Sequence, residues 1–220
     1  LVFDGLDTFA TVWLNGERVA KSEDMFIPLI IDVTDKLRYG DYNTLAVRLG
    51  APWYETIKRA GDFSETNLLW NGNYARLYVR KAQYQYGWDW AVKLLTTGIW
   101  RSVRLVAYDK AVIKDVYART IEAGKDKAGI EVVVEVESSG EYDATLTITG
   151  LCKDSRFTSM SPVKLVEGLN TFRFTIDVDK PKLWWPRGYG PQNLYDLKVK
   201  LTVGDEVEDE YSTCLLYTSD

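Results

Sequence analysis

Apolar and polar residues alternate one by one along much of the chain, and this period of two predicts β-strands that bury one face. The alternation is most regular in the second half, where Gly, Ser, Asp and Pro separate the runs. It predicts strands over residues 112–120, 129–137, 143–149, 155–158, 169–178 and 194–203. Six or seven short strands in about 100 residues are typical of an immunoglobulin-like β-sandwich.

The first half alternates less regularly. Phe9–Leu14 runs into Asn15-Gly16, which predicts a hairpin because a type I′ turn needs positive φ at both central residues. Further strands are expected over residues 27–33, 43–49, 76–84 and 100–108, with one helical turn at 34–37. Residues 51–75 show no clear period and predict a long loop, which in a compact domain is usually functional or mobile.

No stretch beyond 12 residues keeps a helical period, so we expect an all-β chain of two sandwiches with a boundary near 108–112. A length of 220 residues allows two domains of about 100 residues each. Leu1 already lies in an apolar run, so we expect the first domain to be truncated at its N-terminus. The closing residues interrupt the alternation, and we hypothesise that 213–220 is a non-native tail.

The composition limits which catalytic groups, metals and partners the chain can use. The chain has no His, which excludes Ser-His-Asp and Cys-His catalysis as well as His-ligated metals. Cys152 and Cys214 are too few for a zinc site or a disulfide framework, so we expect no metal and no cofactor. A net charge of −5 and a pI near 5.0 argue against nucleic acid or an anionic membrane as partner. We expect a soluble protein, cytoplasmic or periplasmic if the source is bacterial.

The segment RKAQYQYGWDW holds the strongest candidate for sugar binding. Asp89 stands between Trp88 and Trp90, and a carboxylate can accept hydrogen bonds from two adjacent sugar hydroxyls while an indole packs on the C–H face. Arg80 or Arg76 could orient Asp89 through a bidentate pair. In the alternative interpretation, both indoles alternate into the core and Asp89 caps a turn.

Other segments favour structural interpretations. The segment LWWPRGYGPQNLY predicts a rigid aromatic corner between strands, since Pro191 follows its Gly-x-Gly and no helix begins there to cradle a phosphate. The acidic run 205–210 predicts a solvated hairpin tip. No carboxylate pair stands out as acid and base, because one strand places three glutamates on a single solvent face, namely Glu131, Glu135 and Glu137.

Five segments together resemble the N-terminal region of glycoside hydrolase family 2. They are LVFDGLDTFATVWLNG, NTLAVRL, RKAQYQYGWDW, GIWR and LWWPRGYGPQNLY. Within the family, RKAQY…GWDW with WWPRGYG most resembles the β-mannosidases. The resemblance implies a jelly-roll, galactose-binding-like domain over residues 1–108 and an immunoglobulin-like domain over 109–212. It also implies a (β/α)₈ barrel in cis with two catalytic glutamates, outside this chain.

The resemblance implies that Trp88 and Asp89 contact the terminal mannose, with Arg80 and Trp90 in support and no catalytic residue in this chain. Ala91-Val92 stands where the family usually has Gly-Pro. The implied parent is a retaining exo-β-mannosidase acting on terminal non-reducing β-D-mannose, with N-glycan-derived or mannan oligosaccharides as substrates. The first domain would contribute to its active-site rim, and this chain by itself would be inactive.

Three alternatives remain open. A carbohydrate-binding module without a catalytic partner would share the jelly roll and the aromatic residues. A purely structural, adhesin-like double sandwich would need no sugar contact. Within the enzyme class, the neighbours are exo-β-glucosaminidase, β-glucuronidase and β-galactosidase.

Overall fold

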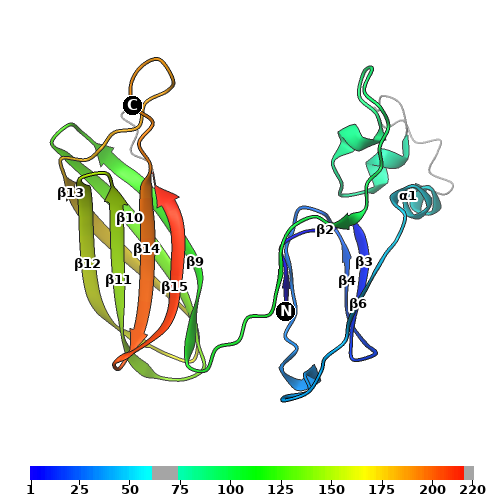
Figure 1. Ribbon diagram of the computed structural model, residues 1–220, viewed down its shortest axis with the longest axis horizontal. Helices are drawn as coiled ribbons and strands as arrows, with labels where there is room; N and C mark the ends of the chain where they lie inside the picture. Colours follow the sequence, from blue (N-terminus) through cyan, green and yellow to red (C-terminus); the bar gives the residue numbers. More distant parts are fainter. Residues whose placement is uncertain (61–73, 216–220) are drawn as a thin grey trace. The chain divides into compact units, whose positions relative to one another are not determined.

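The computed structural model describes residues 1–60 and 74–215, and the chain divides into two compact units, Leu1–Val106 and Ala107–Asp220 (Figure 1). Strands dominate both units, which confirms the all-β prediction. No helix in the described ranges is long and apolar enough to cross a membrane. The limits 1–108 and 109–212 stay predictions, as does the non-native tail 213–220, of which 216–220 lie outside the described residues.

The second unit is a two-layered antiparallel sandwich, as the immunoglobulin-like prediction requires. One sheet has the order β13-β10-β9 and the other the order β12-β11-β14-β15. The strands are β9 (Ala111–Ala123), β10 (Lys127–Ser138), β11 (Tyr142–Cys152), β12 (Ser155–Leu165), β13 (Gly168–Asp179), β14 (Tyr195–Val203) and β15 (Glu206–Leu215). β15 is one strand more than the alternation predicted.

The core of this sandwich follows from the period of two. Along β10, Ile130, Val132, Val134 and Val136 are each fully buried, whereas the glutamates between them lie on the opposite, partly exposed face. Glu131 on that face accepts a hydrogen bond from Nε of Arg119 at 2.8 Å, and this bond lowers the pKa of its carboxyl. The expected solvent face for these glutamates is therefore confirmed.

The acidic run departs from the prediction. Only Gly204 and Asp205 form the turn, and the remaining acidic residues begin β15. The side chain of Glu208 is only 12% exposed and accepts a hydrogen bond from Nζ of Lys110 at 2.9 Å. Oδ2 of Asp209 accepts the backbone N–H of Ile113 at 2.9 Å. The hairpin-tip interpretation is therefore wrong beyond Asp205, because these carboxylates join β15 to the start of β9.

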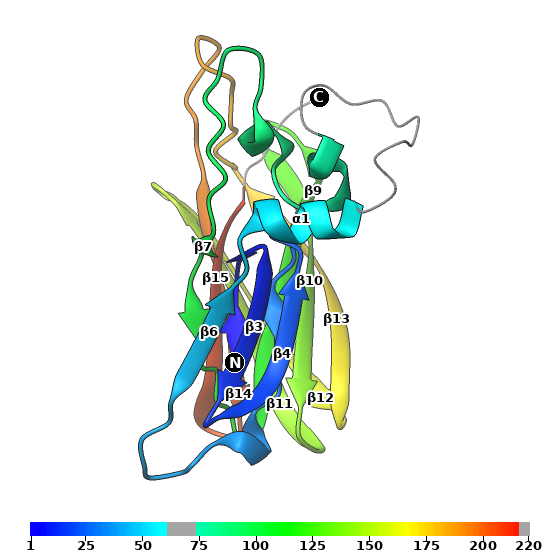
Figure 2. The ribbon, with the colours of Figure 1, turned by 90° about the vertical axis from the view of Figure 1, so that its right-hand side faces the viewer.

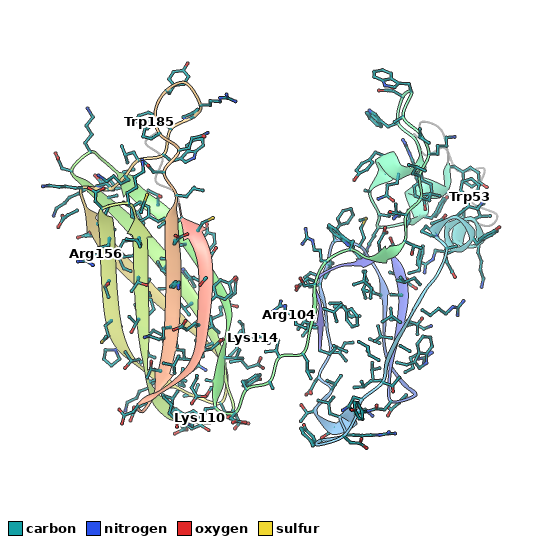
Figure 3. The ribbon with its side chains drawn as sticks, viewed as in Figure 1. Trp53, Arg104, Lys110, Lys114, Arg156 and Trp185 are labelled. Atoms are coloured by element: carbon teal, nitrogen blue, oxygen red, sulfur yellow. The ribbon has the colours of Figure 1, made fainter. Side chains whose placement is uncertain are left out.

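A loop between β13 and β14 carries the double-tryptophan segment (Figure 3, Trp185). The N–H of Trp185 donates to the carbonyl of Pro191 at 3.1 Å, and Nδ2 of Asn193 donates to the carbonyl of Leu183 at 2.8 Å. A Cβ on Gly190 would lie 2.7 Å from the Trp185 ring, so only glycine allows this close approach. These contacts close the loop into the aromatic corner expected from the sequence.

The first unit is built from three small sheets with orders β5-β1-β8, β2-β7 and β4-β3-β6. Its strands are β1 (Val2–Phe3), β2 (Leu6–Asp7), β3 (Phe9–Leu14), β4 (Glu17–Glu23), β5 (Leu29–Ile30), β6 (Leu45–Leu49), β7 (Gly98–Ile99) and β8 (Val103–Arg104). Its helices are α1 (Pro52–Ala60) and the 3₁₀ helices η1 (Thr34–Lys36), η3 (Tyr74–Tyr78) and η4 (Gln83–Tyr86). Phe3, Leu6, Ala10 and Val12 form its buried core.

The predicted hairpin is confirmed. β3 pairs with β4, and the turn residues Asn15 and Gly16 have φ values of 54° and 85°. These are the positive angles that a type I′ turn needs at both positions. The helical turn expected at 34–37 is confirmed by η1.

Four predictions in this unit are wrong in whole or in part. The long loop of 51–75 contains α1, which Pro52 starts and which lies across the end of the β4-β3-β6 sheet (Figure 2). The nine residues of α1 are too few to reveal a helical period in the sequence. The rest of the predicted loop at 61–73, including Trp70, lies outside the described residues. The strand expected over 76–84 is replaced by η3 and η4. Among the described residues, its β-pairing is limited to one isolated bridge between Asp24 and Arg80. The strands expected over 27–33 and 100–108 shrink to β5 and β8.

Tyr195 gives a test of the second unit. Its buried hydroxyl accepts the N–H of Lys182 at 2.8 Å and donates to Oγ of Ser155 at 2.7 Å. We expect Tyr195→Phe to lower the free energy of unfolding by about 1–3 kcal/mol, because both partners lose a buried bond. Urea unfolding followed by circular dichroism measures the change. The control Tyr117→Phe removes the hydroxyl of a 56%-exposed tyrosine, and equal losses in both variants would contradict the expectation.

Candidate functional site

The candidate site lies on a protruding segment of the first unit, residues 82–95, which we call the arm. It begins with η4, extends away from the sheets and returns to β7 (Figures 1 and 2). The N–H of Ala91 donates to the carbonyl of Trp88 at 2.7 Å and closes a turn at its tip. Gly87 has φ of 112° and lies against the Lys93 side chain, so it meets both a left-handed backbone and a close contact. Asp89 has φ of 44°, a region that Asp tolerates better than most residues.

The tip presents its aromatic side chains to solvent. Trp88 is 58% exposed and Trp90 is 94% exposed, and Asp89 between them is also exposed. The interpretation that the two indoles alternate into the core is therefore wrong. The reason is that the arm belongs to none of the sheets formed by the described strands, so its alternation does not mark a buried sheet face.

The base of the arm is held by a buried ion pair between Lys81 and Asp7. The Lys81 side chain is fully buried and that of Asp7 is 4% exposed. Oδ2 of Asp7 accepts Oγ1–H of Thr96 at 2.9 Å, and Nζ of Lys81 also donates to the Thr96 carbonyl at 2.8 Å. Both ends of the arm thus meet at one carboxylate on β2. Local sequence patterns do not reveal this trio; the signals present are an Asp inside an apolar strand run and a Lys in a segment rich in aromatic residues.

Helix α1 supports the start of the arm. Oγ1 of Thr56 lies 3.4 Å from the hydroxyl of Tyr86, the last residue of η4. Burial raises the pKa of Tyr86, the hydrogen bond with Thr56 opposes this, and the charge of Asp7 adds to it. The tyrosine therefore stays neutral and packs as part of the base.

The two arginines do not reach Asp89. Nη1 of Arg80 lies 3.7 Å from Oδ2 of Asp24, and Arg80 borders an open depression of about 440 Å³ together with Arg59 and Glu23. Arg76 is 8% exposed on η3, and its Nε has no hydrogen-bond partner among the residues that the structure describes. Within residues 1–60 and 74–215, no ion pair joins either arginine to Asp89. Arg80 thus acts at the base of the arm, beside β4.

The arrangement suits recognition of a neutral polyol. A carboxylate between two indoles offers hydrogen-bond acceptors beside flat apolar surface, which matches the hydroxyls and C–H face of a sugar ring. Across the part of the chain that the structure describes, no group of three or more His, Cys, Asp or Glu side chains is placed to hold a metal ion.

Truncating the tip tests its exposure. We expect Trp90→Ala and Trp88→Ala to change the free energy of unfolding by less than about 0.5 kcal/mol, because neither indole fills a core. Urea unfolding measures this, with acrylamide quenching of tryptophan fluorescence as a second readout. Val12→Ala, which truncates a fully buried side chain of the same unit, should cost clearly more. If Trp90→Ala lowered the free energy of unfolding as much as the control does, the indole would have to be buried in the core.

Comparison with known proteins connects this geometry to a family. Residues 1–101 match the family model described as glycosyl hydrolase 2 galactose-binding domain-like, and residues 111–214 match that of glycosyl hydrolases family 2. The chain is 37% identical over 221 residues to a protein named Beta-mannosidase B from Emericella nidulans, covering 96% of this chain and 25% of that protein. Beta-mannosidase B from Thermothelomyces thermophilus is also 37% identical, covering 96% and 24%.

Solved structures show the same similarity to family 2 enzymes. A β-D-mannosidase from Dictyoglomus thermophilum superposes with a TM-score of 0.83 at 33% identity, covering 96% of this chain and 26% of that one. A family 2 β-glucuronidase, at 18% identity and a TM-score of 0.72 over 98% of this chain and 22% of that one, shows the shared fold alone. The chain spans about a quarter of the length of the curated relatives it matches. One family model falls within each unit, and the chain belongs to glycoside hydrolase family 2.

Proposed function

We propose that this chain is a non-catalytic part of a retaining exo-β-mannosidase and that its first domain forms part of the active-site rim. The similarity along nearly the whole chain to proteins named β-mannosidases carries this proposal. The substrates are carbohydrates with a terminal non-reducing β-D-mannose, such as N-glycan-derived or mannan oligosaccharides. A putative β-galactosidase and a β-glucuronidase share the fold at only 20% and 18% identity. The proteins named β-mannosidases are 33–37% identical, so β-mannoside is the favoured substrate.

In this proposal the tip of the arm binds the terminal sugar. The Asp89 carboxylate accepts hydrogen bonds from two neighbouring hydroxyls, and the face of Trp88 packs on the C–H side of the ring. The exposure of both residues supports this, since the side chains are free to meet a ligand. Trp90 adds apolar surface beside them, and Arg80 supports the base through Asp24.

The chemical step is assigned to residues outside this chain. A retaining glycosidase places two carboxylates about 5–5.5 Å apart, one as nucleophile and one as acid and then base. We assign both to the barrel that the family layout implies. The contribution of the arm is then binding energy: contacts to the terminal sugar that tighten in the transition state raise kcat/KM without taking part in bond cleavage.

The chain alone should therefore be inactive. We expect no release of nitrophenol from p-nitrophenyl β-D-mannopyranoside above the buffer rate, because the nucleophile and the acid are absent. A matched titration of the same sample with mannose distinguishes the main alternative, since a free-standing carbohydrate-binding module would bind the sugar measurably. Turnover by the purified chain would contradict the assignment of catalysis to another domain.

Asp89 is tested in the full-length protein that carries this chain. We expect Asp89→Ala to lower kcat/KM for the β-mannoside by about 1–4 kcal/mol of transition-state binding. Asp89→Asn should give a smaller loss, because Asn keeps one acceptor and tolerates the positive φ of this position. The control Asp205→Ala removes an exposed turn carboxylate of the second unit and should leave the rate unchanged. Wild-type kinetics in both Asp89 variants would remove this residue from the site.

A further inference from the structure

The two ends of the arm converge on one carboxylate. Lys81 immediately precedes the arm and Thr96 immediately follows it. Nζ of Lys81 pairs with Oδ1 of Asp7, and Oγ1 of Thr96 donates to Oδ2 of the same side chain at 2.9 Å. The direct bond from Lys81 to the Thr96 carbonyl, at 2.8 Å, closes the triangle. Each end is thus fixed both to the other end and to β2.

The carboxylate is itself fixed by its neighbours. Asp7 pairs with Gly98 across the β2-β7 ladder, and Oγ1 of Thr97 donates to the Asp7 carbonyl at 2.7 Å. Oγ1 of Thr8 donates to Oδ1 of Asp7 at 2.8 Å. Backbone and side chain of Asp7 therefore both have defined partners, so the carboxylate is a rigid reference point for the arm.

Burial makes this arrangement hard to rearrange. If the buried ammonium of Lys81 lost its counter-ion, its desolvation would no longer be compensated by the attraction to Asp7. Conformations that separate Lys81 from Asp7 are therefore strongly disfavoured. Among residues 1–60 and 74–215, no buried ion pair of this kind holds the tip. Its exposed apolar residues, Trp88, Trp90, Val92 and Leu94, are between 58% and 94% exposed. The position of the tip is consequently set mainly at the base.

We propose that Lys81, Asp7 and Thr96 form a clamp that positions Trp88 and Asp89 for binding of the terminal sugar. The inference rests on the proposed function, because the place of the tip matters only if the tip touches substrate. The clamp residues are positioning residues and make no contact with the sugar. A displacement of about 1 Å in a recognition group can cost about 100-fold in rate, so a loosened clamp should reduce activity without removing any sugar contact outright.

The test is a double-mutant cycle in the full-length protein that carries this chain. Lys81→Met removes the charge, and Thr96→Val removes the hydroxyl at the other end while leaving the ion pair in place. Each substitution is made in the wild type and in a tip variant, Trp88→Ala/Asp89→Ala, which lacks the two proposed sugar-binding side chains. We expect kcat/KM to fall at least about tenfold in Lys81→Met and severalfold in Thr96→Val in the wild type. In the tip variant, neither substitution should change kcat/KM by more than twofold.

The outcomes separate the clamp from the proposed function. If the tip variant keeps wild-type kcat/KM, the proposed sugar contact fails. If the tip variant loses activity while Lys81→Met and Thr96→Val do not, the clamp is wrong and the proposed function stands. Equal losses in both backgrounds would show a general structural role and also overturn the clamp. If Lys81→Met does not fold, Thr96→Val alone decides between these results.

A matched control uses the same substitution elsewhere in the unit. Lys36→Met breaks the ion pair of Lys36 with Glu17, whose side chains are 40% and 60% exposed. An exposed pair contributes little, so kcat/KM should stay within twofold of the wild type in both backgrounds. A loss in Lys36→Met equal to that in Lys81→Met would show that the effect is not specific to the clamp, and would overturn it.

Discussion

A charge that leaves water needs an opposite charge at close range, and in the first unit Lys81 meets this need at Asp7. The Asp7 carboxylate thereby ties β2 to Lys81, which lies 74 positions later and immediately precedes the arm, and it also accepts a bond from Thr96, which immediately follows the arm. β2, β7 and η4 are each too short to be stable alone, and the pair gives them a common point of attachment. The arm can therefore be exposed along most of its length and still leave the unit from a defined place.

The second unit is stabilised in a different way. Its strands are long, each has one apolar face, and the two sheets bury those faces against each other. Polar contacts at the margins add to this core, where Lys110 meets Glu206 and Glu208 and where Tyr195 ties the aromatic corner to β12. Such a core tolerates exposed loops at its ends without loss of register. The contrast explains why one unit carries the candidate site on an arm while the other presents a regular sandwich.

The proposed function gives the first unit the role of a non-catalytic scaffold. In the proposed function, sugar specificity comes from a carboxylate and an indole carried on a β-scaffold, while bond cleavage belongs to a separate domain. A recognition group placed this way needs a rigid base, because the base sets where the group meets its ligand. The clamp supplies that base through side chains that never meet the substrate.

The sequence by itself determined the all-β class, the sandwich of the second unit and the Asn15-Gly16 hairpin, because period-two alternation and positive-φ turns are local properties. It also singled out the GWDW segment as the candidate for sugar binding, which stays a prediction. Only the tertiary structure decided that Trp88 and Trp90 face solvent, since alternation cannot reveal whether a facing sheet exists. The same holds for α1, which is too short for its period to show, and for the pairing of Lys81 with Asp7. That contact joins distant residues, and no local pattern encodes which buried charge meets which.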